Sequence, residues 1–218
     1  MTAEEFVAAL AADNGARLER LAVKSAAGDA AETLTVPKLL RLALRNELEA
    51  AELAAAWMTD TPELDAKLAL ARQCGDEAKH YRWIEERLAE LGDHLEGFDP
   101  AAPGPSPLLT YLRGLRGTVE RAAAGQFTRE AIAVVRNDVF ADFCAERGDE
   151  KTAQLYRERI QPDEQHHHEL GRRLLLRYAT TPEAQAAARA AAGRTLEVAE
   201  EIQELARLRA GVSRAPGC

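Results

Sequence analysis

The stretch Asp163-Glu164-Gln165-His166-His167-His168-Glu169 has the same Asp-Glu-x-x-His form as an earlier stretch, Asp76-Glu77-Ala78-Lys79-His80. Positions three apart lie on one face of a helix, so each stretch can turn one carboxylate and one imidazole toward the same point. The two resulting pairs are Glu77 with His80 and Glu164 with His167. If the two helices face each other, these pairs would bracket a metal site. A single Glu-x-x-His arises often by chance on charged helices, whereas two copies with the same preceding Asp are a specific signal.

The composition predicts an all-α fold in one domain. The 218 residues are 46% hydrophobic but only 5% aromatic, and they are rich in the strong helix formers Ala, Leu, Glu and Arg. A chain of this length can bury one sizeable core and does not require two.

Charge and cysteine content argue against several classes of protein. The formal net charge of −8 disfavours a nucleic-acid partner, which usually meets a basic face. No apolar run approaches the roughly 20 residues of a membrane span, and the chain starts with acidic Glu4 and Glu5, so we expect neither a membrane anchor nor a signal peptide. The three cysteines are scattered and odd in number, which disfavours a disulfide framework. We therefore expect a cytoplasmic protein.

Two apolar seams, each interrupted by one acid, predict a helical hairpin. The helix expected over about 35–58 has the seam Leu40, Leu44, Glu47, Ala51, Ala54 and Met58. The helix expected from Pro62 to about Leu91 has the seam Leu70, Cys74, Glu77, Tyr81, Ile84, Leu88 and Leu91. The connection between them is short, which favours an antiparallel pair. A carboxylate in such a seam needs a partner, because burying it unpaired is costly.

We expect one helical domain over 1–212, followed by a flexible tail over 213–218. An N-terminal helical arm over 1–33, with a turn at Asp13-Asn14-Gly15 and a break around Gly28-Asp29, precedes a four-helix bundle over 35–179. Within the bundle, the crossover over 93–126 contains a Pro- and Gly-rich linker between Asp93 and Pro107, a helix from Leu108 to about Ala124 and a break at Gly125. The third helix then spans about 128–147, and the fourth spans about 150–179, with Pro162 kinking or restarting it. The final helix, over 182–212, carries the apolar stripe Val198, Ile202, Leu205 and Leu208, which suggests docking or a homodimer.

A weak internal repeat indicates the carboxylates of the other two helices. Arg45-Asn46-Glu47 precedes the first motif, and Arg136-Asn137-Asp138 precedes the second. Residues about equally far from the turn of a hairpin meet at the same height, so we expect Glu47 beside Glu77 and Asp138 beside Glu164. Asp142, one turn further along, is the main competitor of Asp138.

The predicted metal ligands are Glu47, Glu77, His80, Asp138, Glu164 and His167. Four carboxylates neutralise two divalent ions, and two neutral imidazoles complete the ligand set without adding charge. This mixed set suits two iron ions first, with manganese or a mixed Mn/Fe pair second, and the absence of thiolates disfavours structural zinc. Asp76 and Asp163 each precede a ligand Glu, and each can accept the second ring N–H of a histidine on the opposing motif.

This arrangement resembles the ferritin-like di-metal carboxylate superfamily, in which a four-helix bundle supplies a carboxylate from each of two helices and Glu-x-x-His from each of the other two. The resemblance covers about residues 35–179. The Asp-Glu-x-x-His form is similar to that of ribonucleotide reductase small subunits, bacterial multicomponent monooxygenases and acyl carrier protein desaturases. It implies an antiparallel bundle with a long crossover.

Three functions are compatible with these residues. The first is a di-iron oxidoreductase that activates dioxygen to oxidise an unknown organic substrate, with an electron-donor protein as partner. The second is a ferroxidase, peroxide-scavenging or manganese catalase-like protein, for which peroxide or ferrous iron is the substrate. The third is a helical scaffold without metal, which would leave six ionisable groups in a bundle core without cations. Beyond the metal ligands, no catalytic residue is predicted.

Overall fold

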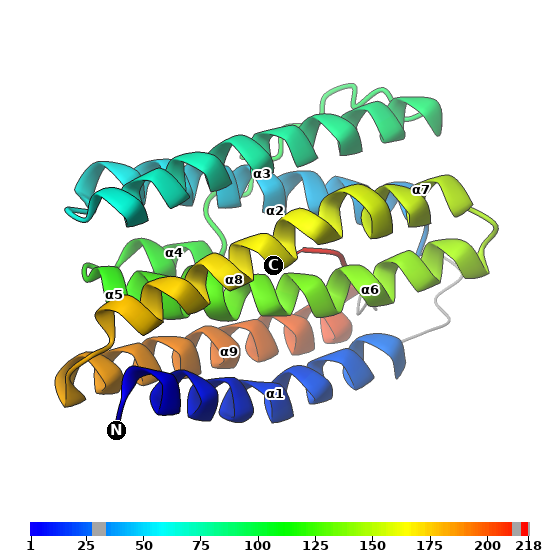
Figure 1. The fold of residues 1–218 in the computed structure, drawn as a ribbon. Helices are drawn as coiled ribbons and strands as arrows, with labels where there is room; N and C mark the ends of the chain where they lie inside the picture. The colour runs from blue at the N-terminus through cyan, green and yellow to red at the C-terminus, as the bar shows by residue number, and fades with distance from the viewer. Residues whose placement is uncertain (28–33, 211–214, 218) are drawn as a thin grey trace.

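The computed structural model describes residues 1–27, 34–210 and 215–217, and these residues form helices and connections without any β-strand. The helices lie in three layers (Figure 1): α2 with α3, then α6 with α8, then α1 with α9. The predicted all-α bundle is confirmed at this level. No helix in the described ranges is both long and apolar enough to cross a bilayer.

The first layer is the predicted hairpin of α2 (Val36–Asp60) and α3 (Leu64–Glu90). Thr35 caps the start of α2, and Pro37 lies in its first turn, where its missing N–H costs nothing. A connection of three residues, 61–63, joins the two helices. Both seam acids, Glu47 and Glu77, are buried together with most of the apolar seam.

The second layer begins earlier than the sequence suggests. After α4 (Pro107–Arg113), one unbroken helical run contains α5 (Thr118–Arg121), the π-helical stretch η1 (Ala122–Arg129) and α6 (Glu130–Glu146). The predicted break at Gly125 is therefore wrong. Gly125 instead allows the helix to pack closely against Trp57, because a β-carbon at Gly125 would lie 2.5 Å from Cζ3 of Trp57.

The return helix of the second layer accommodates Pro162 without a gap. It consists of α7 (Glu150–Leu155), the π-helical stretch η2 (Tyr156–Ile160) and α8 (Gln161–Tyr178). Pro162 lies in the first turn of α8, directly after η2. The wider π turn changes the hydrogen-bonding pattern just where proline cannot donate, so the helical run continues through it.

The third layer differs from the prediction at its start. The helix α1 (Ala3–Ala27) runs through Asp13-Asn14-Gly15, so the predicted turn is wrong. Buried Asn14 donates from Nδ2 to Oγ1 of Thr128, at 2.9 Å, and this hydrogen bond stabilises the helical conformation there. The break predicted at Gly28-Asp29 lies outside the described residues. The other helix of this layer, α9 (Pro182–Ala210), packs on η1.

The described part of the C-terminal tail is not frayed. Pro216 and Gly217 are buried, and Ala215 packs against the core cluster that contains Phe140 and Tyr156. The rest of the predicted tail, residues 213, 214 and 218, lies outside the described residues. Along the apolar stripe of α9, Val198 is buried in the bundle, while Leu205 and Leu208 are exposed.

Candidate metal centre

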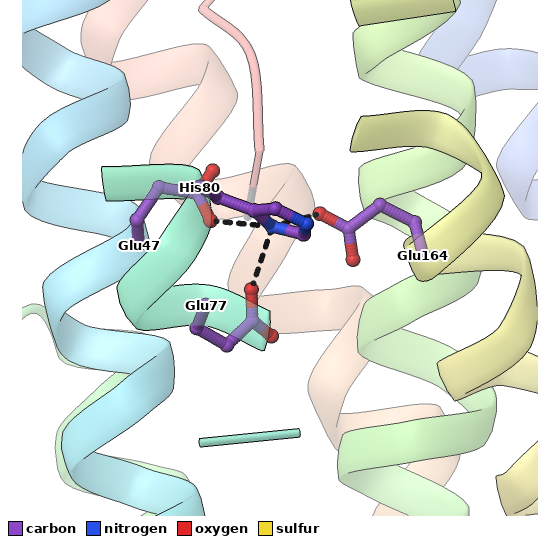
Figure 2. A group of neighbouring side chains, drawn as sticks. All are labelled: Glu47, Glu77, His80 and Glu164. Carbon is purple, nitrogen blue, oxygen red and sulfur yellow. Dashed lines mark hydrogen bonds and ion pairs between the residues drawn. The ribbon is translucent and has the colours of Figure 1, made fainter. Parts of the chain in front are cut away.

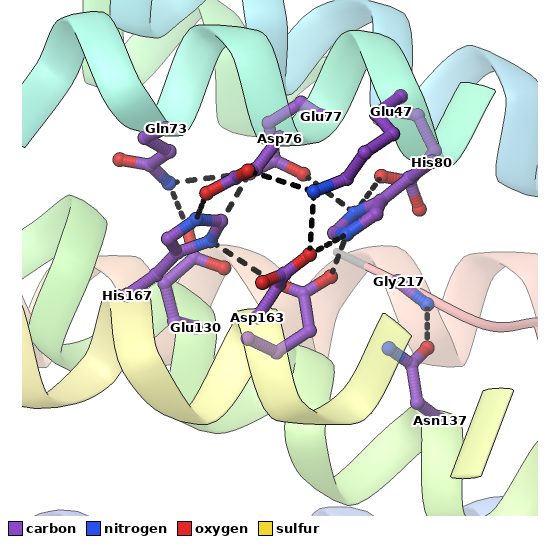
Figure 3. A network of polar contacts seen from close by, with 12 residues as sticks. Glu47, Gln73, Asp76, Glu77, His80, Glu130, Asn137, Asp163, His167 and Gly217 are labelled. Atoms are coloured by element: carbon purple, nitrogen blue, oxygen red, sulfur yellow. Dashed lines mark hydrogen bonds and ion pairs between the residues drawn. The ribbon is translucent and has the colours of Figure 1, made fainter. Parts of the chain in front are cut away.

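Six buried side chains from four helices meet between the first and second layers (Figures 2 and 3). They fall into two groups, and within each group one ligand atom per residue lies within 4.8 Å of all the others. The first group is Glu47, Glu77, His80 and Glu164; the second is Glu77, Glu130, Glu164 and His167. Glu77 and Glu164 belong to both groups. The arrangement thus offers two adjacent sites with two shared carboxylates between them.

The structure brings five of the six residues selected from the sequence into these groups. The two Glu-x-x-His pairs face each other from α3 and α8, and Glu47 reaches the first group from α2. Helix periodicity places each pair on one face, and the apolar seams orient that face toward the opposite hairpin.

Asp138 is the exception, and the structure places Glu130 where Asp138 was expected. Asp138 is exposed and accepts a hydrogen bond from Nε2 of Gln161 at 2.6 Å. Its competitor Asp142 is also exposed, and it pairs with Arg157 at 2.6 Å. Glu130 is 1% exposed and completes the second group.

The missed ligand could have been found from the hairpin geometry. Glu130 and Glu164 lie 18 and 16 residues from Gly148 in the turn, whereas Asp138 lies only 10 residues from it. The predicted helix begins near residue 128, which would place Glu130 at its edge. The helical run in fact starts at Thr118, which puts Glu130 well inside it.

Each histidine is held by an aspartate from the opposite hairpin, as predicted. Nε2 of His80 on α3 lies 3.2 Å from Oδ2 of Asp163, and Nε2 of His167 on α8 lies 3.3 Å from Oδ2 of Asp76. Nζ of Lys79 bridges the two aspartates, at 2.9 Å from Asp76 and 3.1 Å from Asp163. These contacts fix the Nε2 side of both rings, so that Nδ1 faces the carboxylates and is available to a metal.

Glu130 is oriented by two buried donors. Nε2 of Gln73 donates to Oε1 of Glu130 at 2.6 Å, and Nη1 of Arg129 donates to the same oxygen at 2.8 Å. Gln73 is itself held by Nε2 of Gln126, at 3.0 Å from Oε1 of Gln73. The second oxygen of Glu130 is thereby left toward the cluster.

In the metal-free protein, the two histidines are protonated and offset part of the negative charge of the carboxylates. Burial alone would lower the pKa of His80, but its hydrogen bonds with Glu47 and Glu77 outweigh burial and raise the pKa to about 12. Burial would also lower the pKa of His167, but Asp76 and Glu164 raise it to about 11. Both imidazoles therefore carry a positive charge at neutral pH, close to where metal ions would contribute theirs.

The carboxylates respond in opposite directions. Burial raises the pKa of Glu47 to about 7 and raises that of Glu164 well above its usual range. Burial also acts to raise the pKa of Glu77, but the His80 hydrogen bond and the charges of His167 and His80 lower it to about 2. Such divergent shifts within one buried cluster are typical of a functional site.

Three buried polar atoms without a hydrogen bond match the donor set that a metal ion would need, although two of them, Oε2 of Glu164 and Nδ1 of His167, form an ion pair at 3.5 Å. Oε2 of Glu130, Oε2 of Glu164 and Nδ1 of His167 are buried and form no hydrogen bond within the part of the chain that the structure describes. Buried polar atoms are rarely left in this state, because desolvating them is costly. All three belong to the second group, where divalent ions would satisfy them.

The flanking histidines have structural surroundings. Nδ1 of His168 lies 2.7 Å from the carbonyl oxygen of Phe127, and the His168 ring stacks on the Phe127 ring. His166 is half-buried and belongs to neither group. His168 and Gly171 thus dock α8 on η1, next to the helix that carries Glu130.

No family model matches this chain, and no curated protein or solved structure is significantly similar to it. Function is therefore inferred from the geometry and chemistry of the site itself.

Proposed function

We propose that this protein is a di-iron oxidoreductase that activates dioxygen to oxidise an organic substrate. The observation that carries the proposal is the pair of buried ligand groups joined by Glu77 and Glu164. A shared pair of carboxylates between two sites favours a dinuclear centre over a single ion. The similarity of the motifs to the ferritin-like di-metal carboxylate superfamily supports the same assignment.

The charges of the ligand set are balanced by two divalent ions. Four carboxylates carry four negative charges when ionised, and the two histidines bind as neutral imidazoles. When bound, two iron ions would supply the redox chemistry by which dioxygen is reduced. The oxygen- and imidazole-rich set suits iron or manganese, and neither of the cysteines whose surroundings are described, Cys74 and Cys144, belongs to the groups.

The protein's own residues would orient the ligands and exclude water. Asp76 and Asp163 fix the histidine tautomers, while Arg129 and Gln73 hold one oxygen of Glu130. The six ligands are at most 3% exposed, so bulk water is kept from the centre. An electron-donor protein would then be required to return the centre to its reduced state after each turnover.

One observation favours a second candidate function, in which peroxide or ferrous iron is the substrate. The cavity that borders Glu130, lined partly by Ala50, Ala54 and Trp57, has a volume of about 10 Å³. This is about the space needed for one water molecule. It has room only for a water-sized ligand, so an organic substrate would need the helices to move, whereas a small inorganic substrate requires much less space.

The first experiment is elemental analysis of the protein purified without a His tag. We expect two Fe or Mn per chain, and we expect Glu77→Ala and Glu164→Ala to lose both, because each residue belongs to both groups. Asp142→Ala is the matched control, since Asp142 is an exposed acid outside the groups. Metal content that is unchanged in the first two variants would contradict the proposed centre.

The metal-loaded protein then separates the two candidates. Dioxygen consumption that depends on a chemical reductant and is slow with peroxide supports the oxygen-activating oxidoreductase. Rapid disproportionation of hydrogen peroxide, or rapid oxidation of added ferrous iron without a reductant, supports the second candidate.

A further inference from the structure

The short C-terminal segment Ala215–Gly217 bridges the two hairpins beside the metal centre. The carbonyl oxygen of Pro216 accepts a hydrogen bond from Nδ2 of Asn46, at 2.8 Å. The backbone N–H of Gly217 donates to Oδ1 of Asn137, also at 2.8 Å (Figure 3). Asn46 belongs to α2 and Asn137 to α6, so the segment is held from both layers.

The two asparagines occupy matching places in the internal repeat. Asn46 directly precedes the ligand Glu47, and Asn137 precedes Asp138 in the corresponding Arg-Asn-acid sequence. Since Asp138 does not reach the centre, the repeat is not explained by ligand binding alone. A common role in holding the C-terminal segment accounts for the asparagine in both copies.

Gly217 lies close to the ligand Glu47. A β-carbon on Gly217 would lie 3.3 Å from Cβ of Asn46 and 3.7 Å from Oε1 of Glu47. Gly217 also has φ of +71°, a conformation that side chains disfavour. The positive φ and the tight approach to Asn46 therefore both favour glycine at this position.

We propose that Ala215–Gly217 is a strap that closes the centre on the Glu47 side and sets how fast metal ions and small ligands exchange there. The inference rests on the proposed dinuclear centre. A metal ion can dissociate on the Glu47 side only after the strap has detached. Detachment breaks the hydrogen bonds of the strap to Asn46 and Asn137.

The test is the rate at which excess EDTA extracts Mn²⁺ from the loaded protein. One variant lacks residues 215–218, and a second, Gly217→Ala, keeps the full chain but strains the strap. We expect extraction about tenfold faster in both, equivalent to about 1.4 kcal/mol, with the bound Mn²⁺ per chain unchanged. Gly148→Ala is the matched control: its φ of +77° imposes the same backbone strain, but no atom lies within 4 Å of the added β-carbon.

The outcomes separate the strap from the centre. Extraction at the same rate in the unaltered protein and both strap variants overturns the strap proposal while leaving the centre intact. Acceleration in Gly148→Ala as large as in Gly217→Ala also overturns it, because general destabilisation would then be the cause. If the unaltered protein binds no Mn²⁺, the proposed centre fails, and the strap proposal fails with it.

Discussion

Gly171 determines how closely α8 approaches η1, so Gly171→Ala should weaken both the fold and the metal centre. A β-carbon on Gly171 would lie 2.4 Å from the backbone nitrogen of Phe127 and 2.7 Å from the carbonyl carbon of Gln126. Ordinary van der Waals contact begins near 3.4 Å, and backbone atoms cannot rotate away as a side chain can. The two helices must therefore separate by about 1 Å at this point.

The expected loss of stability follows from this overlap. Overpacking costs about 3 kcal/mol at the upper end of its usual range. In a chain of this length each kcal/mol lowers Tm by roughly 2–4 °C, so the variant should melt roughly 6–12 °C below the unaltered protein. Gly171 lies one turn beyond His167, so the separation also draws His167 away from Glu130, and metal binding should weaken.

Circular dichroism melting of the metal-free protein and titration with Mn²⁺ measure the two effects. Gly193→Ala is the matched control, because it makes the same change in helix α9 where no atom lies within 4 Å of the added β-carbon. There the higher helix propensity of alanine should stabilise the protein by up to about 1 kcal/mol. A Gly171→Ala protein that melts at or above the unaltered protein would refute the close approach of α8 and η1.

Three further predictions concern the ligands. Glu130→Ala should bind fewer metal ions per chain while Asp138→Ala retains the full number, as measured by elemental analysis; the reverse result would restore Asp138 as the ligand. Metal affinity should rise with pH, because the raised pKa values of His80 and His167 keep both imidazoles protonated at neutral pH and metal must displace those protons. Calorimetric titration in buffers of different ionisation enthalpy should show net proton release, and no release would contradict these protonation states. Asp76→Asn should weaken metal binding roughly 10–100-fold in a chelator competition, and unchanged affinity would show that this aspartate does not tune its histidine.

The parts of the site that depend on local spacing could be predicted from the sequence. Glu77 with His80 and Glu164 with His167 need only one helical turn each, and the seam pattern placed Glu47 because the turn at Pro62 marks the centre of its hairpin. The contact of each aspartate with the histidine of the opposite hairpin could also be predicted, because each aspartate directly precedes a ligand glutamate.

The features that depend on tertiary contacts could not be predicted in this way. Glu130 was missed because Gly125 predicts a break in the segment 122–129, which is in fact π-helical. The glycine is needed there for close packing against Trp57 of another layer, a contact that the local sequence does not reveal. The turn expected at Asn14 is absent because Thr128, distant in sequence, supplies its hydrogen bond. Local propensity is a weak guide wherever such contacts override it.

The crossed aspartates have a consequence for assembly. The aspartate of each hairpin supports the histidine of the other, and the two shared carboxylates, Glu77 and Glu164, also come from different hairpins. Neither hairpin alone contains a complete site, so the binding site exists only after the hairpins have docked. Any ion bound there stabilises the docked state by mass action. Bound metal should therefore stabilise the docking of the two hairpins, which is the last step of folding. Chelation should weaken the contact between the two layers before the helices of either layer unfold.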